Sequence, residues 1–153
     1  MAARHRQRHR PRRAASAGFT LVELMVVVII ASVLVAIAIP SYIDKVRKSR
    51  RTEAKTALLD LAGREERYYN TNNAYTNLPA NLGYGAGVFP LNVGSGYYQV
   101  TVAAPAPAAG NPPTYTITAT PLGDQIKDAQ CQQFQLTNSG LQTSAPNLTA
   151  CWQ

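Results

Sequence analysis

The pattern of apolar and polar residues changes twice along this chain. Residues 19–39 form an almost unbroken apolar run in which Glu23 is the single charged side chain. Residues 40–69 are amphipathic, with apolar side chains at spacings of three and four that fall on one face of a helix. From residue 70 onward, short stretches alternate apolar and polar residues, as half-buried β-strands do. The pattern therefore predicts a long helix followed by a small β-rich head.

The predicted helix runs from Phe19 to Tyr69 and would be about 75 Å long at the usual rise per residue. A helix of that length does not fit inside a compact domain of this size, so half of it must protrude or lie in another medium. Pro40 lacks a backbone N–H and is expected to kink the helix. Charged side chains, Glu65 among them, are expected away from the apolar face of the second half. That apolar face is expected to consist of Ile43, Val46, Ala54, Ala57, Leu58, Leu61 and Tyr68.

The alternating stretches predict an antiparallel sheet of three to four strands with one face on the helix, and hence an α+β fold. Between them, residues 103–113 are rich in Pro and Ala and break the chain. The glycine-rich segment 83–87 follows no predicted strand and opens no clear helix, so we interpret it as a flexible loop and not as a nucleotide site. The expected strands are 97–102, 115–120, 131–137 and, more briefly, 141–143.

The apolar run at 19–39 is long enough to cross a membrane as a helix. The first 18 residues contain six arginines and no acid, which favours an N-terminus left in the cytoplasm. A cleaved signal peptide is one alternative, because Ala36-Ile37-Ala38 fits its cleavage pattern, and a plain membrane anchor is another. Glu23 argues against both, since a carboxylate in lipid is costly and therefore indicates a function.

The high pI of about 9.7 comes mainly from these first residues. The rest of the chain carries nine Lys and Arg against eight Asp and Glu, so the overall pI does not indicate nucleic-acid binding. A local basic cluster remains between Lys45 and Arg51. We expect it to be a solvated helix face next to the membrane, or a surface that pairs with other subunits in a filament. Capture of DNA or of anionic lipid is the alternative.

The sequence offers no catalytic constellation, and no metal or cofactor is predicted. Both histidines, His5 and His9, lie in the basic leader, which removes Ser-His and Cys-His catalysis and His metal ligation from the remainder. Asp124 and Asp128 alone supply too few oxygens for calcium, and we expect them in a solvated loop. The protein is therefore not expected to be an enzyme.

The chain has two cysteines, Cys131 and Cys151. Two cysteines behind an export segment predict one disulfide in an oxidising compartment. The closed loop would stabilise the small head by about 3 kcal/mol in the chain-entropy model.

The basic leader followed by Gly18-Phe19-Thr20-Leu21-Val22-Glu23 resembles the processing site of a type IV prepilin. The resemblance implies cleavage between Gly18 and Phe19 by a prepilin peptidase that also N-methylates Phe19. It implies that the apolar run is kept and becomes the packing element of a helical filament. There Glu23 would pair with the N-terminal ammonium of a neighbouring Phe19, which would offset the cost of both buried charges and set the axial register.

The C-terminal region resembles PilE-type minor pilins in its Cys131-x-x-Phe134-x-Leu136 run, its turn at Gly140 and its terminal Cys151-Trp152. The resemblance implies a type IV pilin-like fold, in which a long helical spine packs on a small antiparallel sheet with a C-terminal disulfide loop. The expected organisation is a removed leader at 1–18, a membrane and filament-core helix at 19–39, the amphipathic half of the spine at 40–69, and the head at 70–153.

These features together predict a structural subunit of a type IV pilus, with a minor pilin preferred. The expected partners are other pilin subunits, the prepilin peptidase and methyltransferase, the inner-membrane assembly platform and the membrane. The chain would cross the inner membrane once, N-terminus inside, before it joins a pilus at the cell surface. A type II secretion pseudopilin and a DNA-uptake receptor pilin are the alternatives. From Tyr68 to the end there is one base, Lys127, against two acids, which argues against a nucleic-acid partner.

Overall fold

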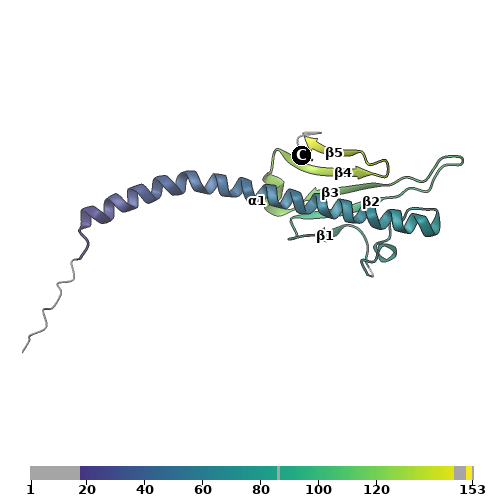
Figure 1. The fold of residues 1–153 in the computed structure, drawn as a ribbon, viewed down its shortest axis with the longest axis horizontal. Helices are drawn as coiled ribbons and strands as arrows, with labels where there is room; N and C mark the ends of the chain where they lie inside the picture. Colours follow the sequence, from purple (N-terminus) through teal and green to yellow (C-terminus); the bar gives the residue numbers. More distant parts are fainter. Residues whose placement is uncertain (1–17, 86, 147–150, 153) are drawn as a thin grey trace, which may run out of the picture. The chain divides into compact units, whose positions relative to one another are not determined.

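The computed structural model describes residues 18–85, 87–146, 151 and 152, which belong to two compact units, Met1–Pro40 and Ser41–Gln153. One long helix, α1 (Leu21–Asn72), begins in the first unit and ends in the second (Figure 1). The predicted leader lies outside the described residues except for Gly18, so its removal stays a prediction from the sequence.

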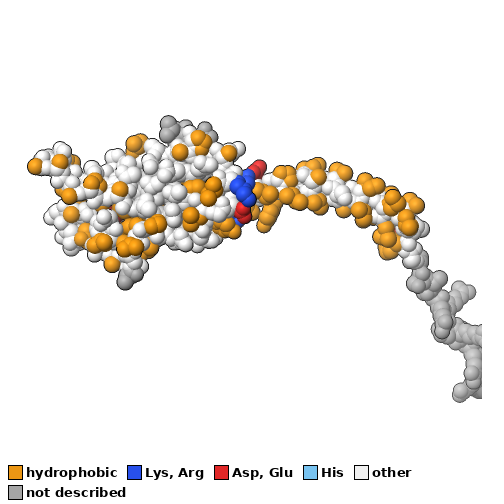
Figure 2. Space-filling model, turned by 180° about the vertical axis from the view of Figure 1, so that it is seen from behind, with side chains coloured by type: hydrophobic (Ala, Val, Ile, Leu, Met, Phe, Trp, Pro, Cys, Tyr) orange, Lys and Arg blue, Asp and Glu red, His pale blue; other side chains and the backbone are white. Residues whose placement is uncertain are grey.

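The described part of the first unit is an apolar helical segment. The hydroxyl of Thr20 accepts the backbone N–H of Glu23 at 3.2 Å and caps the start of α1. Every residue from Leu21 to Ile39 is exposed, and Figure 2 shows hydrophobic side chains along this segment. By length and composition, the helix is long and apolar enough to cross a membrane. Such a surface suits lipid or a bundle of similar helices better than water.

The bounds of α1 agree with the predicted helix to within a few residues at each end. At its C-terminus the helix continues to Asn72, so residues 70–72, expected in the head, are helical. The side-chain amide of Asn72 donates to the backbone carbonyl of Tyr68 at 2.9 Å, and the next residue, Asn73, has φ of 51°. A left-handed residue directly after the last helical turn is a common helix ending, and Asn tolerates it. Pro40 lies inside α1, and the kink expected there remains a prediction.

The C-terminal unit contains a five-stranded antiparallel sheet in the order β1-β2-β3-β4-β5, in which each strand pairs with its neighbours in the sequence (Figure 1). The antiparallel sheet and its four predicted strands are confirmed. The additional strand, β1, was not predicted because three residues are too few to show alternation. The strands are β1 (Leu91–Val93), β2 (Tyr98–Ala103), β3 (Thr116–Pro121), β4 (Cys131–Thr137) and β5 (Gln142–Pro146).

The core of the C-terminal unit lies between the second half of α1 and one face of this sheet, which Figure 1 shows side by side. Alternate residues of β2, β3 and β4 are buried, as the period of two requires. The helix contributes Ala54, Leu58 and Leu61, each fully buried. The sheet contributes Tyr98, Val100, Val102, Ile117, Ala119, Phe134 and Leu136.

Two positions in the second half of α1 were predicted wrongly, one on the apolar face and one on the charged face. Ile43 remains 42% exposed, because the buried stripe of the helix begins only at Ala54. Glu65, expected on a charged face, is fully buried, because it lies one turn beyond Leu61 on the same stripe. The helix therefore places one carboxyl group in its buried stripe.

The predicted disulfide between Cys131 and Cys151 is present, with the two Cα atoms 5.7 Å apart. It ties the C-terminus to the first residue of β4. The indole N–H of Trp152 donates to the carbonyl of Thr143 in β5 at 2.8 Å, and the indole packs edge-on against Phe134. The last turn of the chain is thus fixed to the two strands at that edge of the sheet.

The glycine-rich segment 83–87 was predicted as a flexible loop, and its first part is instead anchored to α1. A short 3₁₀ helix, η1 (Pro79–Leu82), ends at Gly83, which has φ of 80° and donates its N–H to Ala80. The hydroxyl of Tyr84 then donates to the Asp60 carboxylate at 2.8 Å. The segment is held because glycine allows the left-handed turn and tyrosine reaches back to the helix.

Candidate functional site

The residues expected to direct filament assembly lie at the start of the chain's described part. Gly18 and Phe19 precede α1, and Phe19 is 76% exposed. Glu23 lies in the first turn of α1, where a carboxylate is stabilised by the positive end of the helix dipole. Their roles in cleavage, methylation and register remain predictions. The structure places them one after another at the end of an exposed apolar helix.

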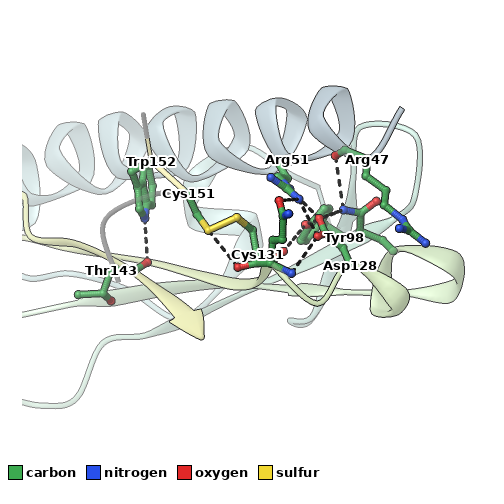
Figure 3. Close-up of a disulfide and its surroundings, with 10 residues drawn as sticks. Arg47, Arg51, Tyr98, Asp128, Cys131, Thr143, Cys151 and Trp152 are labelled. Carbon is green, nitrogen blue, oxygen red and sulfur yellow. Dashed lines mark hydrogen bonds and ion pairs between the residues drawn. A yellow bond between two sulfur atoms is a disulfide. The ribbon is translucent and has the colours of Figure 1, made fainter. Parts of the chain in front are cut away.

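A buried ion pair joins α1 to the segment before β4 in the C-terminal unit (Figure 3). Arg51 donates two hydrogen bonds to Asp128, from Nε to Oδ2 and from Nη2 to Oδ1, both at 2.6 Å. The Asp128 side chain is 2% exposed and that of Arg51 is 17% exposed. The carboxylate raises the pKa of Arg51 above its ordinary value through these bonds. The solvated loop expected at Asp128 is therefore wrong, because the carboxylate is paired and buried.

Further buried polar side chains extend this ion pair into a hydrogen-bond network. The amide of Gln125, fully buried in the 3₁₀ helix η2 (Gly123–Lys127), donates to Asp128 at 2.9 Å and to the Tyr98 hydroxyl at 3.2 Å. The Tyr98 hydroxyl in turn donates to the carbonyl of Cys131 at 3.4 Å. The network thus runs from α1 to the disulfide, and each member fixes the orientation of the next.

The basic cluster predicted between Lys45 and Arg51 only partly forms a solvated face. Arg51 is already paired with Asp128. The guanidinium of Arg50 lies 3.3 Å from the ring centroid of Tyr97, which is a cation–π contact. No carboxylate lies within ion-pair distance of Lys48 among the described residues. No local pattern predicts these contacts, because the partners lie far apart along the chain.

Basic side chains also line a hollow of about 720 Å³ beside this network. We call it the basic hollow. Figure 2 shows charged side chains gathered at one end of the C-terminal unit. Asp44 and Asp128 are its acidic residues, and Arg51 already neutralises Asp128. Its basic residues are Arg47, Lys48, Arg51, Lys55 and Lys127.

Glu65 is the second buried carboxyl group of interest. Its Oε2 accepts the backbone N–H of Thr76 at 3.1 Å, whereas Oε1 has no hydrogen-bond partner among the described residues. Burial raises the pKa of Glu65 to about 7, against the lowering effect of the Thr76 bond. Among the described residues, no group of three or more His, Cys, Asp and Glu side chains is arranged to hold a metal ion. Its burial and its raised pKa make Glu65 a titratable group within the core.

Two family models match the chain. Residues 40–135 match the family described as "Type IV minor pilin ComP, DNA uptake sequence receptor". Residues 13–39 match the "Prokaryotic N-terminal methylation motif". The first match covers more than half of the chain, so the protein belongs to this type IV pilin family. It is accordingly a structural and non-enzymatic protein.

Curated relatives include a "Type IV major pilin protein PilA" from Myxococcus xanthus, 36% identical over 107 residues, which are 62% of this chain and 46% of that protein. The "Fimbrial protein EcpC" of Eikenella corrodens is 38% identical over 46% of each chain. The "Type IV wide pilus major component PilA4" of Thermus thermophilus is 35% identical over 50% of this chain and 59% of that one. The chain spans about half the length of the curated relatives it matches.

Among solved structures, a type IV pilin from Shewanella oneidensis is similar with a TM-score of 0.47 and 21% sequence identity. The similarity covers 70% of this chain and 98% of that chain.

The family match runs against our expectation that nucleic acid is not a partner. That expectation counted charges only from Tyr68 onward. The C-terminal unit begins at Ser41 and therefore includes the basic cluster, which gives nine Lys and Arg against seven Asp and Glu. The charge argument against nucleic acid thus depended on where the head was taken to begin.

Proposed function

We propose that the protein is a minor subunit of a type IV pilus. The observation that carries the proposal is the order of its parts: a segment that matches the methylation motif, an exposed apolar helix, and a disulfide-closed unit that matches a minor-pilin family. Before assembly the apolar segment lies in the inner membrane, with the leader in the cytoplasm. Cleavage after Gly18 and N-methylation of Phe19 then release the subunit for assembly.

In the filament, the apolar segments of neighbouring subunits would pack together. The N-terminal ammonium of Phe19 and the carboxylate of Glu23 are each costly to bury alone. Pairing between subunits offsets that cost only at one axial offset, so it selects the register of the incoming subunit. Glu23 suits this role because it lies in the first turn of α1, four residues after Phe19.

The test is the behaviour of Glu23→Gln, which removes the charge and keeps the size of the side chain. We expect cleavage of the leader to continue and the amount of this subunit in sheared pili to fall several-fold. Leu24→Ile, at the next position of the same exposed helix, keeps an apolar side chain of the same volume and is the matched control, which should be incorporated at close to the normal level. Normal amounts of Glu23→Gln in sheared pili would contradict the register argument.

A type II secretion pseudopilin has the same processing and the same helix. The two roles differ in what is lost with the protein: a pilus subunit affects surface filaments, whereas a pseudopilin affects the release of secreted proteins. Deletion of the gene followed by measurement of both separates them. We expect loss or change of surface pili with secretion intact.

DNA binding is a second candidate function, and the match of residues 40–135 to a DNA-receptor family favours it. The excess of Lys and Arg in the C-terminal unit is compatible with contacts to phosphate. Anisotropy of a labelled short DNA duplex, titrated with the purified chain, tests it. We expect binding at low salt that weakens steeply as salt is added. Absence of binding at low salt would contradict it.

A further inference from the structure

We propose that the basic hollow binds the phosphate headgroups of anionic phospholipids and so docks the C-terminal unit on the membrane before assembly. The inference rests on the proposed membrane stage of the protein and goes beyond it. The ligand class is a phosphodiester at a lipid surface. The occupant is the membrane that the chain itself crosses.

The charge of the hollow suits such a ligand. The hollow has two carboxylates. Asp128 accepts two hydrogen bonds of 2.6 Å from Nε and Nη2 of Arg51, and Oδ1 of Asp44 lies 3.8 Å from Nη1 of Arg47. The ammonium of Lys127 has its own partner in Asp124 at 2.8 Å. Lys48 is exposed and Lys55 is half-buried, and neither has an ion-pair partner among the described residues. Two cations therefore remain to meet a phosphate group in the hollow.

The surface next to the basic hollow suits the boundary between headgroups and acyl chains. A second hollow of about 420 Å³ is lined by Tyr42, Ile43 and Val46, together with three basic residues and one acid, Asp124. Tyr42 is 70% exposed and Ile43 is 42% exposed. Exposed tyrosine and aliphatic side chains beside Lys and Arg are typical of membrane-interface surfaces.

The position in the sequence gives the third argument. These residues directly follow the apolar run that ends at Ile39, so with the leader in the cytoplasm they lie beside the headgroups of the opposite membrane face. Lys and Arg close to a surface that carries anionic lipid are attracted to it within about a Debye length. Among the described residues, the two hollows are lined by a single aromatic side chain, Tyr42, whereas single-stranded nucleic acid needs a row of aromatic rings for stacking. Together the charge, the apolar neighbours and the position favour a lipid surface over a nucleic acid at this hollow.

Trp152 provides a built-in reporter, because it is the one tryptophan of the chain and follows Cys151, which lines the basic hollow. The full chain is reconstituted in nanodiscs of phosphatidylcholine, with or without phosphatidylglycerol, and with a dansyl-labelled lipid as energy acceptor. We expect energy transfer from Trp152 to rise when phosphatidylglycerol is present and to fall again on addition of salt. Inorganic phosphate added to neutral discs should leave the transfer unchanged, which separates a lipid surface from free phosphate.

Lys48→Glu tests the hollow, and Arg67→Glu is the matched control because it makes the same charge change on an exposed position of the same helix outside the hollow. Each lysine near an anionic surface contributes about fivefold, or about 1 kcal/mol. Lys48→Glu should therefore weaken docking on phosphatidylglycerol at least fivefold, and Arg67→Glu should weaken it less than twofold.

Equal transfer in the two kinds of disc, or equal effects of the two variants, would overturn the proposal. If Lys48→Glu leaves the transfer unchanged and abolishes binding of a short DNA duplex, the hollow is a nucleic-acid site and the lipid proposal fails. A chain that co-purifies with discs but shows no phosphatidylglycerol effect contradicts the docking alone. A chain that the discs do not retain contradicts the membrane stage of the proposed function itself.

Discussion

Asp128 shows at the scale of one residue how the C-terminal unit is held together. Its carboxylate is almost completely buried and receives hydrogen bonds from Arg51, from Gln125 and from the backbone of Gln130. A buried charge is tolerable only while its partners remain, so the loss of one partner costs more than the pair contributes. The pair joins residues 77 positions apart and therefore fixes α1 to the segment before β4.

Arg51→Met is therefore expected to lower the free energy of unfolding by about 3 kcal/mol, because it leaves the Asp128 carboxylate buried without a cation. Urea unfolding of the oxidised protein measures this. Arg67→Met, at an exposed position with no ion pair among the described residues, should change stability by less than about 0.5 kcal/mol. Equal effects of the two substitutions would show that the Arg51 pair does not stabilise the fold.

Glu65 gives a prediction for the dependence of stability on pH. Its pKa in the folded protein is about 7, above the ordinary value of 4.5, mainly because burial disfavours the charged carboxylate. The folded protein then holds this proton more tightly than the unfolded chain does. Its contribution is complete below about pH 4.5 and is lost as the pH rises toward 7.

We expect stability to decrease by about 1–3 kcal/mol across this window, and Glu65→Gln to abolish that decrease. Thermal melts of both proteins between pH 4.5 and 7 measure the difference in slope. Glu66→Gln is the control, because Glu66 is exposed and its charge is the smallest of the three causes that shift the pKa of Glu65, so most of the slope should remain. The same slope in the Glu65→Gln variant as in the unaltered protein would contradict the assignment.

At the scale of elements, the turn between β1 and β2 is fastened to α1. Ser95 donates its backbone N–H and its hydroxyl to the Glu53 carboxylate at distances of 2.8–2.9 Å, and these bonds lower the pKa of Glu53. Gly94 has φ of 55°, and a Cβ added there would overlap the Glu53 side chain. Glycine is therefore required at this position both for the turn and for the close approach of the helix.

Gly94→Ala should lower the melting temperature more than Gly96→Ala does. Both glycines are left-handed, but a Cβ at Gly96 meets open space, so the difference between the variants isolates the overlap with Glu53. The left-handed strain alone costs about 1–2 kcal/mol in each case. Equal shifts in differential scanning calorimetry would mean that the turn moves away from α1 without cost.

The sequence predicted those elements whose pattern is local. The 3.6-residue and 2-residue periods located α1 and strands β2 to β5, and two cysteines after an apolar run were enough for the disulfide. Strand β1 escaped because three residues show no period. The burial of Glu65 could have been predicted, because Glu65 continues the spacing of Leu58 and Leu61. The ion pair between Arg51 and Asp128 could not have been predicted, because tertiary packing brings the two residues together and no local pattern indicates it.

At the scale of the whole molecule, the two parts of the chain suit two different solvents, lipid and water. The described residues before Pro40 present an apolar helix with every side chain exposed, whereas the unit from Ser41 carries the buried core, the sheet and the disulfide. An apolar helix of this kind is stable in lipid or among its own copies, and the C-terminal unit is stable in water. A subunit that moves from a membrane into a filament needs both properties. The central claim is therefore that the apolar segment is kept after processing.

The mass of the N-terminal peptide tests this claim most directly. The protein is isolated from membranes and from sheared filaments, and the first peptide of each is measured by mass spectrometry. We predict a chain that begins at Phe19 and carries one additional methyl group in both fractions. A chain that begins at Ile39 would contradict the account, because it would show that the apolar segment is a signal peptide that is removed on export.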